Sequence, residues 1–339
     1  MIITYGRQDI SDDDIYTVIS VLKSDYLTQG PFVERFESEI SIYCSSNFCT
    51  AFNSATSALH AACSALEASA DDIIWTSAIT FVASANCALY CGASIDFVDI
   101  SNKTYNICTH KLEAKLKEAF LQKKLPKILI PVHLAGQSCD MKRIHELSLE
   151  YGFKIIEDAS HAIGGSYLDS KIGQCKYSDI TIFSFHPVKI ITSGEGGVAT
   201  TNDKLLQDKM LEFRTHGITK DANKFSIQSP GPWYYEQNTL GYNYRITDFQ
   251  AALGCSQLKR LDEFIEKRHI LANRYNDFLS NSKIVTPFQE DFSYSSFHLY
   301  IIWINFDELK ITQSDAFNFM RTKSIGVNID YIPVYENRV

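Results

Sequence analysis

Two residues able to do carbonyl chemistry stand at the ends of separate strand-like segments. Lys189 follows residues 183–188, and Asp158 ends an apolar run that includes Ile155 and Ile156. A lysine amine can form a Schiff base with the aldehyde of pyridoxal phosphate, and a carboxylate elsewhere can hold the pyridine nitrogen of that cofactor protonated. The pair therefore predicts pyridoxal-phosphate chemistry of the aminotransferase kind.

Each member of the pair also has a simpler interpretation. Lys189 alone fits a surface lysine in a hairpin, and Asp158 alone fits the N-cap of a following helix. However, Pro187 and the glycine cluster at 194–197 predict a tight turn around the lysine, and Phe185 beside it would desolvate the amine and lower its pKa. An unpaired carboxylate after an apolar strand is costly, whereas a cationic ring nitrogen would satisfy it.

Further segments could hold the rest of such a cofactor. Residues 53–58 join a strand-like run to a helix, so free backbone N–H groups there favour an anion site, with Thr56 and Ser57 as phosphate ligands and Ser184 as a second candidate. Phe81 could stack on the pyridine face, and His161 could orient the ring or bond its phenolic oxygen. Alternatively, these residues form an ordinary capped helix, a core phenylalanine and a packed histidine.

Strand-like and helical segments alternate through the first two thirds of the chain. Strands are expected at 48–52, 73–75, 94–98, 127–132, 153–157, 180–185 and 197–201, with helices at 12–22, 32–43, 55–66, 82–91, 109–122 and 142–151. This alternation predicts an α/β fold with a mainly parallel sheet covered on both faces. Asn53, Thr80, His133, Asp158 and Lys189 all follow strands, so we expect them to converge at one sheet edge.

A change of pattern divides the chain. We expect a large domain at 1–247 with an N-terminal helix arm and a smaller C-terminal domain at 248–339, which holds one long helix at 250–279, a strand at 300–306 and a helix at 315–322.

Composition excludes several classes of function. The 339 residues carry 40 acidic and 32 basic side chains, which argues against a nucleic-acid partner. Nine cysteines without metal-ligand spacing indicate reduced thiols and no metal, and we expect a cytoplasmic protein without a membrane span. No GxGxxG, HExxH or GxSxG motif is present in the sequence, so nicotinamide, zinc-protease and serine-hydrolase chemistry have no anchor.

These motifs, taken together and in order, resemble those of the DegT/DnrJ/EryC1/StrS sugar-nucleotide aminotransferases. The resemblance runs from Tyr5 to about Tyr335 and is carried by residues 27–31, 53–60, 80–86, 131–137, 157–162, 183–197 and 241–248. It implies an aspartate-aminotransferase-like fold (pyridoxal-phosphate fold type I), with a large, mainly parallel sheet of seven strands and a smaller α+β C-terminal domain. It also implies a homodimer with shared active sites.

Residues 185–189, 214–218 and 232–236 look most like the C4 aminotransferases of the pseudaminic-acid pathway. That subgroup implies a UDP-linked 4-keto-6-deoxy-N-acetylhexosamine as substrate and L-glutamate as amino donor. The resemblance assigns each site residue a role. Lys189 would be the Schiff-base lysine and proton shuttle, Asp158 would bind the pyridine nitrogen, and Phe81 would stack on the ring, with His161 beside them. The phosphate would be bound by Ala55, Thr56 and Ser184, together with Asn243 from the neighbouring subunit. The substrate would be contacted by Thr28, Gln29, His133 and Arg245. The glutamate carboxylate needs a cation, for which Arg245 and Arg214 both qualify.

The sequence departs from the family pattern near its end. Where the family has a histidine-containing substrate strand and a last helix, residues 328–335 place Asp330 and the chain stops at Val339, so we expect an incomplete small domain. Three alternatives stay open: a C3 aminotransferase, an enzyme for GDP- or dTDP-sugars, and a cofactor-binding protein without turnover. A related sugar dehydratase would carry histidine in place of Lys189.

Overall fold

The computed structural model describes residues 2–336. Its helices are α1 (Asp12–Leu22), α2 (Pro31–Cys44), α3 (Ala55–Ala65), α4 (Ala83–Tyr90), α5 (Thr109–Gln122), α6 (Met141–Tyr151), α7 (Lys204–Arg214), α8 (Asp248–Leu258), α9 (Leu261–Leu279), α10 (Phe306–Leu309) and α11 (Gln313–Thr322). Its strands are β1 (Phe48–Phe52), β2 (Ile73–Ser77), β3 (Ser94–Val98), β4 (Ile128–Ile130), β5 (Lys154–Asp158), β6 (Ser166–Tyr167), β7 (Ser170–Lys171), β8 (Ile180–Ser184), β9 (Gly197–Thr201), β10 (Ile218–Thr219), β11 (Glu236–Gln237), β12 (Ile284–Val285), β13 (Ser293–Tyr294) and β14 (Trp303–Ile304).

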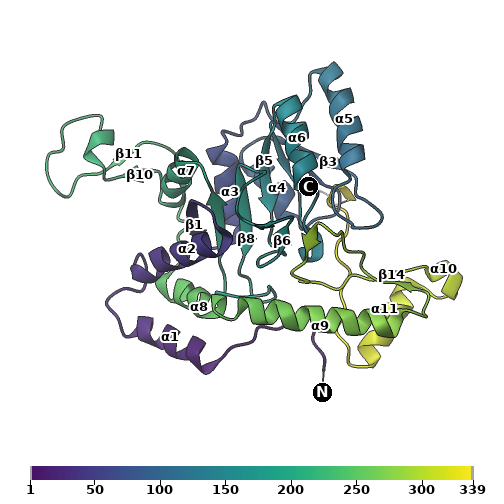
Figure 1. The fold of residues 1–339 in the computed structure, drawn as a ribbon. Coiled ribbons are helices and arrows are strands. Elements are labelled where there is room, and N and C mark those ends of the chain that lie inside the picture. Colours follow the sequence, from purple (N-terminus) through teal and green to yellow (C-terminus); the bar gives the residue numbers. More distant parts are fainter. Residues whose placement is uncertain (1, 337–339) are drawn as a thin grey trace.

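A seven-stranded sheet forms the centre of the molecule, in the order β1-β9-β8-β5-β4-β2-β3 (Figure 1). The neighbouring strands β3, β2, β4, β5 and β8 run parallel to one another. In this sheet β9 alone runs antiparallel to its neighbours, β8 and β1. The predicted α/β class with a large, mainly parallel sheet is confirmed. The carboxyl ends of the parallel strands therefore meet at one edge, where the candidate residues were expected.

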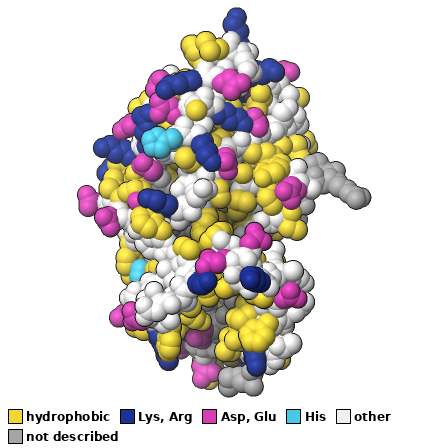
Figure 2. Space-filling view, turned by 90° about the vertical axis from the view of Figure 1, so that its right-hand side faces the viewer, with side chains coloured by type: hydrophobic (Ala, Val, Ile, Leu, Met, Phe, Trp, Pro, Cys, Tyr) yellow, Lys and Arg dark blue, Asp and Glu magenta, His cyan; other side chains and the backbone are white. Residues whose placement is uncertain are grey.

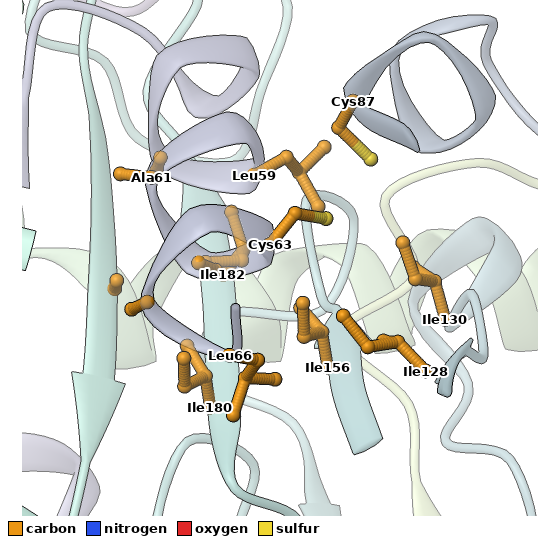
Figure 3. Packing of buried hydrophobic residues seen from close by; sticks show 14 of the residues in the cluster. Leu59, Ala61, Cys63, Leu66, Cys87, Ile128, Ile130, Ile156, Ile180 and Ile182 are labelled. Carbon is orange, nitrogen blue, oxygen red and sulfur yellow. The ribbon is translucent and has the colours of Figure 1, made fainter. Parts of the chain in front are cut away.

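Burial on both faces explains the apolar strands. All three residues of β4 and all five of β8 are buried, as a sheet covered by helices on both sides requires. On one face, Leu59, Cys63 and Leu66 of the α3 segment pack against isoleucines of β4, β5 and β8 (Figure 3). On the other face, α2, α8 and the start of α9 pack against β1, β8 and β9 through a second apolar cluster. This rigid double-sided core holds the strand ends in place.

The prediction of one continuous helix at 250–279 is wrong, because two helices, α8 and α9, span this region. The helical conformation is interrupted between α8 and α9. Arg260, at this interruption, donates a hydrogen bond to the carboxylate of Asp14 in α1 at 2.6 Å. That contact joins distant parts of the chain, so local helical spacing could not reveal it. Ala251 of α8 and Ile265 of α9 also belong to the apolar cluster that packs against β1, β8 and β9.

The C-terminal region has less regular structure than expected. The strand predicted at 300–306 is reduced to β14, and the helix predicted at 315–322 is α11, which has no buried residue. The face at the right of Figure 1 carries apolar side chains gathered near its middle among charged ones (Figure 2). An arm that includes β10 and β11 projects from the opposite side of the molecule (Figure 1).

Candidate active site

Asp158 and Lys189 come from neighbouring strands. Asp158 is the last residue of β5, which pairs in parallel with β8, and Lys189 lies in the turn that follows β8. In that turn the Lys189 N–H donates to the carbonyl of His186 at 2.9 Å. The sheet therefore brings together the two residues that the sequence paired.

The carboxylate of Asp158 is buried without a cationic partner. Its side chain is 5% exposed, and it accepts hydrogen bonds from the hydroxyl of Ser84 at 2.6 Å and the N–H of Ser160 at 3.1 Å. Within residues 2–336 it forms no ion pair. Since a buried charge is stable only when paired, this carboxylate fits a ligand with a cationic group such as a protonated pyridine.

The amine of Lys189 has the character of a nucleophile. Burial lowers its pKa to about 8, although Asp158 and Asp330 act in the opposite direction. Near neutral pH a useful fraction of the amine is therefore unprotonated. Across the described part of the chain, no hydrogen-bond partner holds its Nζ, so the amine is available to bond a ligand.

A helix N-terminus and two strands form a cradle for an anion. Ser54 caps α3 by accepting from the N–H of Ser57 at 3.1 Å, which leaves the N–H groups of Ala55 and Thr56 without partners inside the helix. The backbone of β9 approaches this end so closely that a Cβ on Gly197 would lie 2.4 Å from the nitrogen of Ala55. Ser184 pairs with Gly197 and is 8% exposed. The predicted phosphate residues thus lie together.

The two predicted ring contacts both lie close to Tyr331, a residue of the C-terminal region. Phe81 is 56% exposed in the segment between β2 and α4, and its ring centroid is 6.1 Å from that of Tyr331. His161 is buried, and its Nε2 lies 3.3 Å from the hydroxyl of Tyr331. Sequence analysis assigned no role to Tyr331.

His133 occupies a different environment from the one expected. Its side chain has no exposed surface, its Nε2 lies 2.7 Å from Glu157, and its Nδ1 accepts from the N–H of Cys139. Burial lowers the pKa of His133, whereas the side chains of Cys139 and Glu157 act in the opposite direction and raise it overall. This burial argues against the expected substrate contact and gives His133 a role in fixing the end of β4.

The structure separates the two candidate cations. Arg214 forms an ion pair with Glu37 at 2.6 Å and donates to the carbonyl of Ala51, so its charge is already compensated. Arg245 is half-buried and has no carboxylate partner in the described region. A glutamate carboxylate would therefore find an unpaired cation at Arg245.

The remaining predicted contacts lie in exposed segments. Asn243 is exposed, and its carbonyl accepts from the side chain of Asn53 at 3.4 Å, which places the backbone of Asn243 beside the α3 end of its own chain. Thr28 pairs with Thr247 in an isolated bridge, and Gln29 beside it has a positive φ of 54°. Both Thr28 and Gln29 are exposed and available to a ligand.

Two groups were missed because their partners are distant in sequence. Ser84 belongs to the motif at 80–86, but only the fold shows that its hydroxyl bonds Asp158 and lies 2.8 Å from that of Thr80. The spacing of Thr80 and Ser84 by one helical turn was the available signal. Tyr331 approaches the site from the other end of the chain, and the position of residues 328–335 in the family pattern was the available signal.

These features fit pyridoxal phosphate as a ligand. Asp158 would hold the ring nitrogen, the α3 end with Ser184 would hold the phosphate, and the Lys189 amine would bond the aldehyde. The family model for "DegT/DnrJ/EryC1/StrS aminotransferase family" matches residues 8–339. The chain belongs to this family. It is accordingly a pyridoxal-phosphate-dependent sugar-nucleotide aminotransferase.

Individual relatives agree with this assignment. A UDP-4-amino-4,6-dideoxy-N-acetyl-beta-L-altrosamine transaminase from Campylobacter jejuni is 40% identical over 336 residues, which cover 98% of this chain and 85% of the relative. The structure of Helicobacter pylori PseC, an aminotransferase of pseudaminic-acid biosynthesis, matches with a TM-score of 0.90 at 30% identity, over 100% of this chain and 87% of that one. A candidate sugar aminotransferase, Spr1654 from Streptococcus pneumoniae in its PLP form, matches with a TM-score of 0.87 at 26% identity, over 100% and 87% of the two chains.

The sequence predicted a protein without a membrane span, and the helices of the structure bear on that prediction. Among the described residues, none of the helices combines the length and the apolar character needed to cross a membrane. Likewise, residues 2–336 contain no cluster of three or more side chains suited to hold a metal ion.

Proposed function

We propose that this enzyme transfers the amino group of L-glutamate to the C4 keto carbon of a UDP-linked 4-keto-6-deoxy-N-acetylhexosamine. The similarity that carries the proposal is the 40% identity to the altrosamine transaminase over nearly the whole chain. Lys189 lies in the turn after β8, near Asp158 at the end of the neighbouring strand β5, and the two supply the chemistry that such a reaction needs.

Bound pyridoxal phosphate would supply an aldehyde that accepts the amino group and an electron-poor ring that stabilises negative charge. Asp158, fixed by Ser84 and Ser160, keeps the ring nitrogen positively charged. The Nζ of Lys189, whose pKa burial lowers to about 8, would take the proton from the carbon of glutamate that bears the amino group and return it to the carbon on the other side of the nitrogen, which is the carbon supplied by the cofactor's aldehyde. Because the same site then works in the opposite direction on the sugar ketone, the kinetics are expected to be of the ping-pong type.

Arg245 is proposed to bind a carboxylate of glutamate, because its charge has no carboxylate partner among the described residues, whereas Arg214 is paired with Glu37. Thr28 and Gln29, exposed near the start of α8, are proposed as sugar contacts. Asn243 is proposed to complete the phosphate site from the partner subunit of a homodimer.

The decisive experiment is product analysis. The purified enzyme with pyridoxal phosphate and glutamate is incubated with a panel of UDP-, GDP- and dTDP-linked 4-keto and 3-keto sugars. Mass spectrometry detects the exchange of keto oxygen for an amino group, and NMR locates the nitrogen. Preferential amination at C4 of the UDP-linked N-acetylhexosamine supports the proposal, whereas amination at C3 or of another nucleotide sugar contradicts it.

A further inference from the structure

The chain from Tyr242 to Tyr244, called here the Asn243 segment, is extended and lies beside the end of α7. The N–H of Tyr244 donates to the carbonyl of Arg214 at 3.0 Å, and the carbonyl of Tyr242 accepts from the N–H of His216 at 2.9 Å. Asn243 lies between these two bonds in an antiparallel bridge. Because side chains alternate between the two sides of an extended chain, both tyrosines lie on one side and Asn243 lies on the other.

The tyrosine side of the Asn243 segment packs between α3 and α7. The rings of Tyr242 and Tyr244 are stacked, with centroids 4.9 Å apart and an angle of 15°. They lie 5.1 and 5.9 Å from the ring of His60 in α3, and 5.0 and 6.1 Å from that of Phe213 in α7. Four rings from three parts of the chain therefore hold the segment in one orientation.

His60 adds a hydrogen bond to this aromatic cluster. Its side chain is 5% exposed, and its Nδ1 lies 3.2 Å from the hydroxyl of Tyr244. Burial lowers the pKa of His60, and burial also raises the pKa of Tyr244, so both rings are uncharged at neutral pH. The bond fixes the tyrosine along its length, while the stacking fixes its plane.

The backbone of the Asn243 segment is also bound to the start of α3. The N–H of Asn53 donates to the carbonyl of Tyr244 at 2.9 Å, and the side chain of Asn53 donates to the carbonyl of Asn243 at 3.4 Å. Asn53 directly precedes Ser54, the N-cap of α3. The segment is thus held rigidly against the phosphate cradle of its own chain.

The side-chain amide of Asn243 has no such restraint. Asn243 is exposed, and no hydrogen bond among residues 2–336 uses its amide group. The amide lies on the side of the segment opposite the aromatic cluster, so it points away from α3 and α7 of its own chain. A group in this position is suited to a ligand held by another molecule.

A ligand group that reaches a second chain gains most when its own chain already holds it in place. Ordering a loose segment on binding costs free energy, whereas a segment fixed beforehand avoids that cost. The Asn243 segment is fixed beforehand by its aromatic cluster and by Asn53.

We propose that Tyr244 and His60 are positioning residues for the neighbouring active site, because they hold Asn243 with its amide directed away from its own α3 and toward phosphate bound by the second chain. The inference rests on the proposed function, in which Asn243 completes the phosphate site of the partner subunit. It adds that the geometry of each site depends on an aromatic cluster in the other chain.

The test uses mixed dimers of two differently tagged chains, of which one carries Lys189→Ala. Borohydride can then reduce pyridoxal phosphate onto the other chain alone, and mass spectrometry of the peptide with Lys189 measures this label at a series of cofactor concentrations. Tyr244→Leu is placed in either chain, and leucine keeps the position apolar. In the chain without Lys189, it should raise the half-saturating concentration about tenfold. In the chain with Lys189, the concentration should stay within about twofold.

Two control variants separate positioning from packing. Tyr244→Phe keeps the stacked ring and loses only the bond to His60, so it should restore most of the affinity, to within about threefold of the natural value. Tyr90→Leu removes another ring that contacts His60, at 5.3 Å, but Tyr90 belongs to α4 and not to the Asn243 segment. Tyr90→Leu should leave labelling within about twofold in either chain.

The outcomes are separable. Equal weakening from Tyr244→Leu in both chains, or the same weakening from Tyr90→Leu, shows a packing effect and overturns the inference. Weakening confined to the chain that carries Lys189 also overturns it, since the cluster then serves its own cradle through Asn53. Asn243→Asp in the chain without Lys189 is the reference: if it leaves labelling of the other chain unchanged, the shared site of the proposed function fails first and the inference fails with it.

Discussion

At the scale of single residues, the chemistry depends on how burial changes two charged groups. Lys189 and Asp158 both lie where solvent is largely excluded, yet the consequences differ. Burial lowers the pKa of the lysine to about 8. The carboxylate instead remains bound to Ser84 and Ser160, which leaves its charge to a ligand. One fold thus provides an amine that is easily deprotonated and a fixed anion near each other.

The pKa of Lys189 predicts how cofactor attachment depends on pH. Only the unprotonated amine attacks an aldehyde, and it is protonated below its pKa of about 8. When pyridoxal phosphate is added to cofactor-free protein, the bonding rate should rise about tenfold per pH unit below that value and level off above it. Stopped-flow absorbance measures the rate. A plateau reached only near pH 10, as for an exposed lysine, would contradict this prediction. The control is Lys189→Ala, which should form no bond with the aldehyde and carry no label after borohydride reduction.

Replacement of the buried carboxylate tests its electrostatic role. Asp158→Asn keeps the shape and can still bond Ser84, but it removes the charge that holds the ring nitrogen protonated. We expect kcat to fall about 10²- to 10³-fold, as for the loss of other preorganised electrostatic groups. Steady-state kinetics measure the loss, and thermal unfolding serves as the control. A kcat within about threefold of the natural value would show that Asp158 does not act on the ring.

At the scale of elements, the phosphate cradle depends on the close approach of β9 to the end of α3. A Cβ on Gly197 would lie 2.4 Å from the backbone nitrogen of Ala55, so Gly197→Ala should push the α3 end away from the anion. The expected result is at least tenfold weaker cofactor binding, measured by fluorescence titration. Gly152→Ala is the control, because Gly152 has a φ of +82° but nothing within 4 Å of its Cβ position. It should lower stability without weakening cofactor binding; equal losses in both variants would argue for a general folding effect.

Local patterns predicted the elements whose partners are close in sequence or repeat regularly. The strands at 94–98 and 197–201 match β3 and β9, and the helix at 109–122 matches α5. The residues of β9 are all buried, those of the edge strand β3 alternate in exposure, and α5 buries one apolar face, so local apolar spacing was enough to predict each of them. At the break between α8 and α9, Arg260 binds Asp14, which is far from it in the chain. The same limit applied to the site: Lys189 and Asp158 were paired from sequence, whereas the burial of His133 and the arrival of Tyr331 required the fold.

At the scale of the whole molecule, the projecting arm gains little stability from burial, because none of the described residues 220–240 is buried. It nevertheless exposes large apolar side chains, including Trp233 at 73% and Leu240 at 74%. Exposed apolar groups on a thin projection are typical of a surface that another chain covers. A second copy of this chain, as in the proposed homodimer, is the expected partner, and Trp233→Glu should shift the sedimentation coefficient from dimer toward monomer.

Mixing two inactive variants tests whether the subunits share their active sites. Lys189→Ala removes the amine, and Asn243→Asp places a negative charge where phosphate is expected to bind, so each variant alone should be inactive. In a mixed dimer with the proposed arrangement, one site has Lys189 from one chain and Asn243 from the other, and is complete. Since half of randomly formed dimers are mixed and each has one intact site, about a quarter of natural activity should return after unfolding and refolding the mixture. The backbone of Asn243 lies beside Asn53 of its own chain, so the opposite arrangement has a clear signature. If Asn243 serves the site of its own chain, each site of a mixed dimer carries one of the two defects, so no activity should return. Activity would then return only if Lys189→Ala and Asn243→Asp were combined in one chain and paired with a natural one.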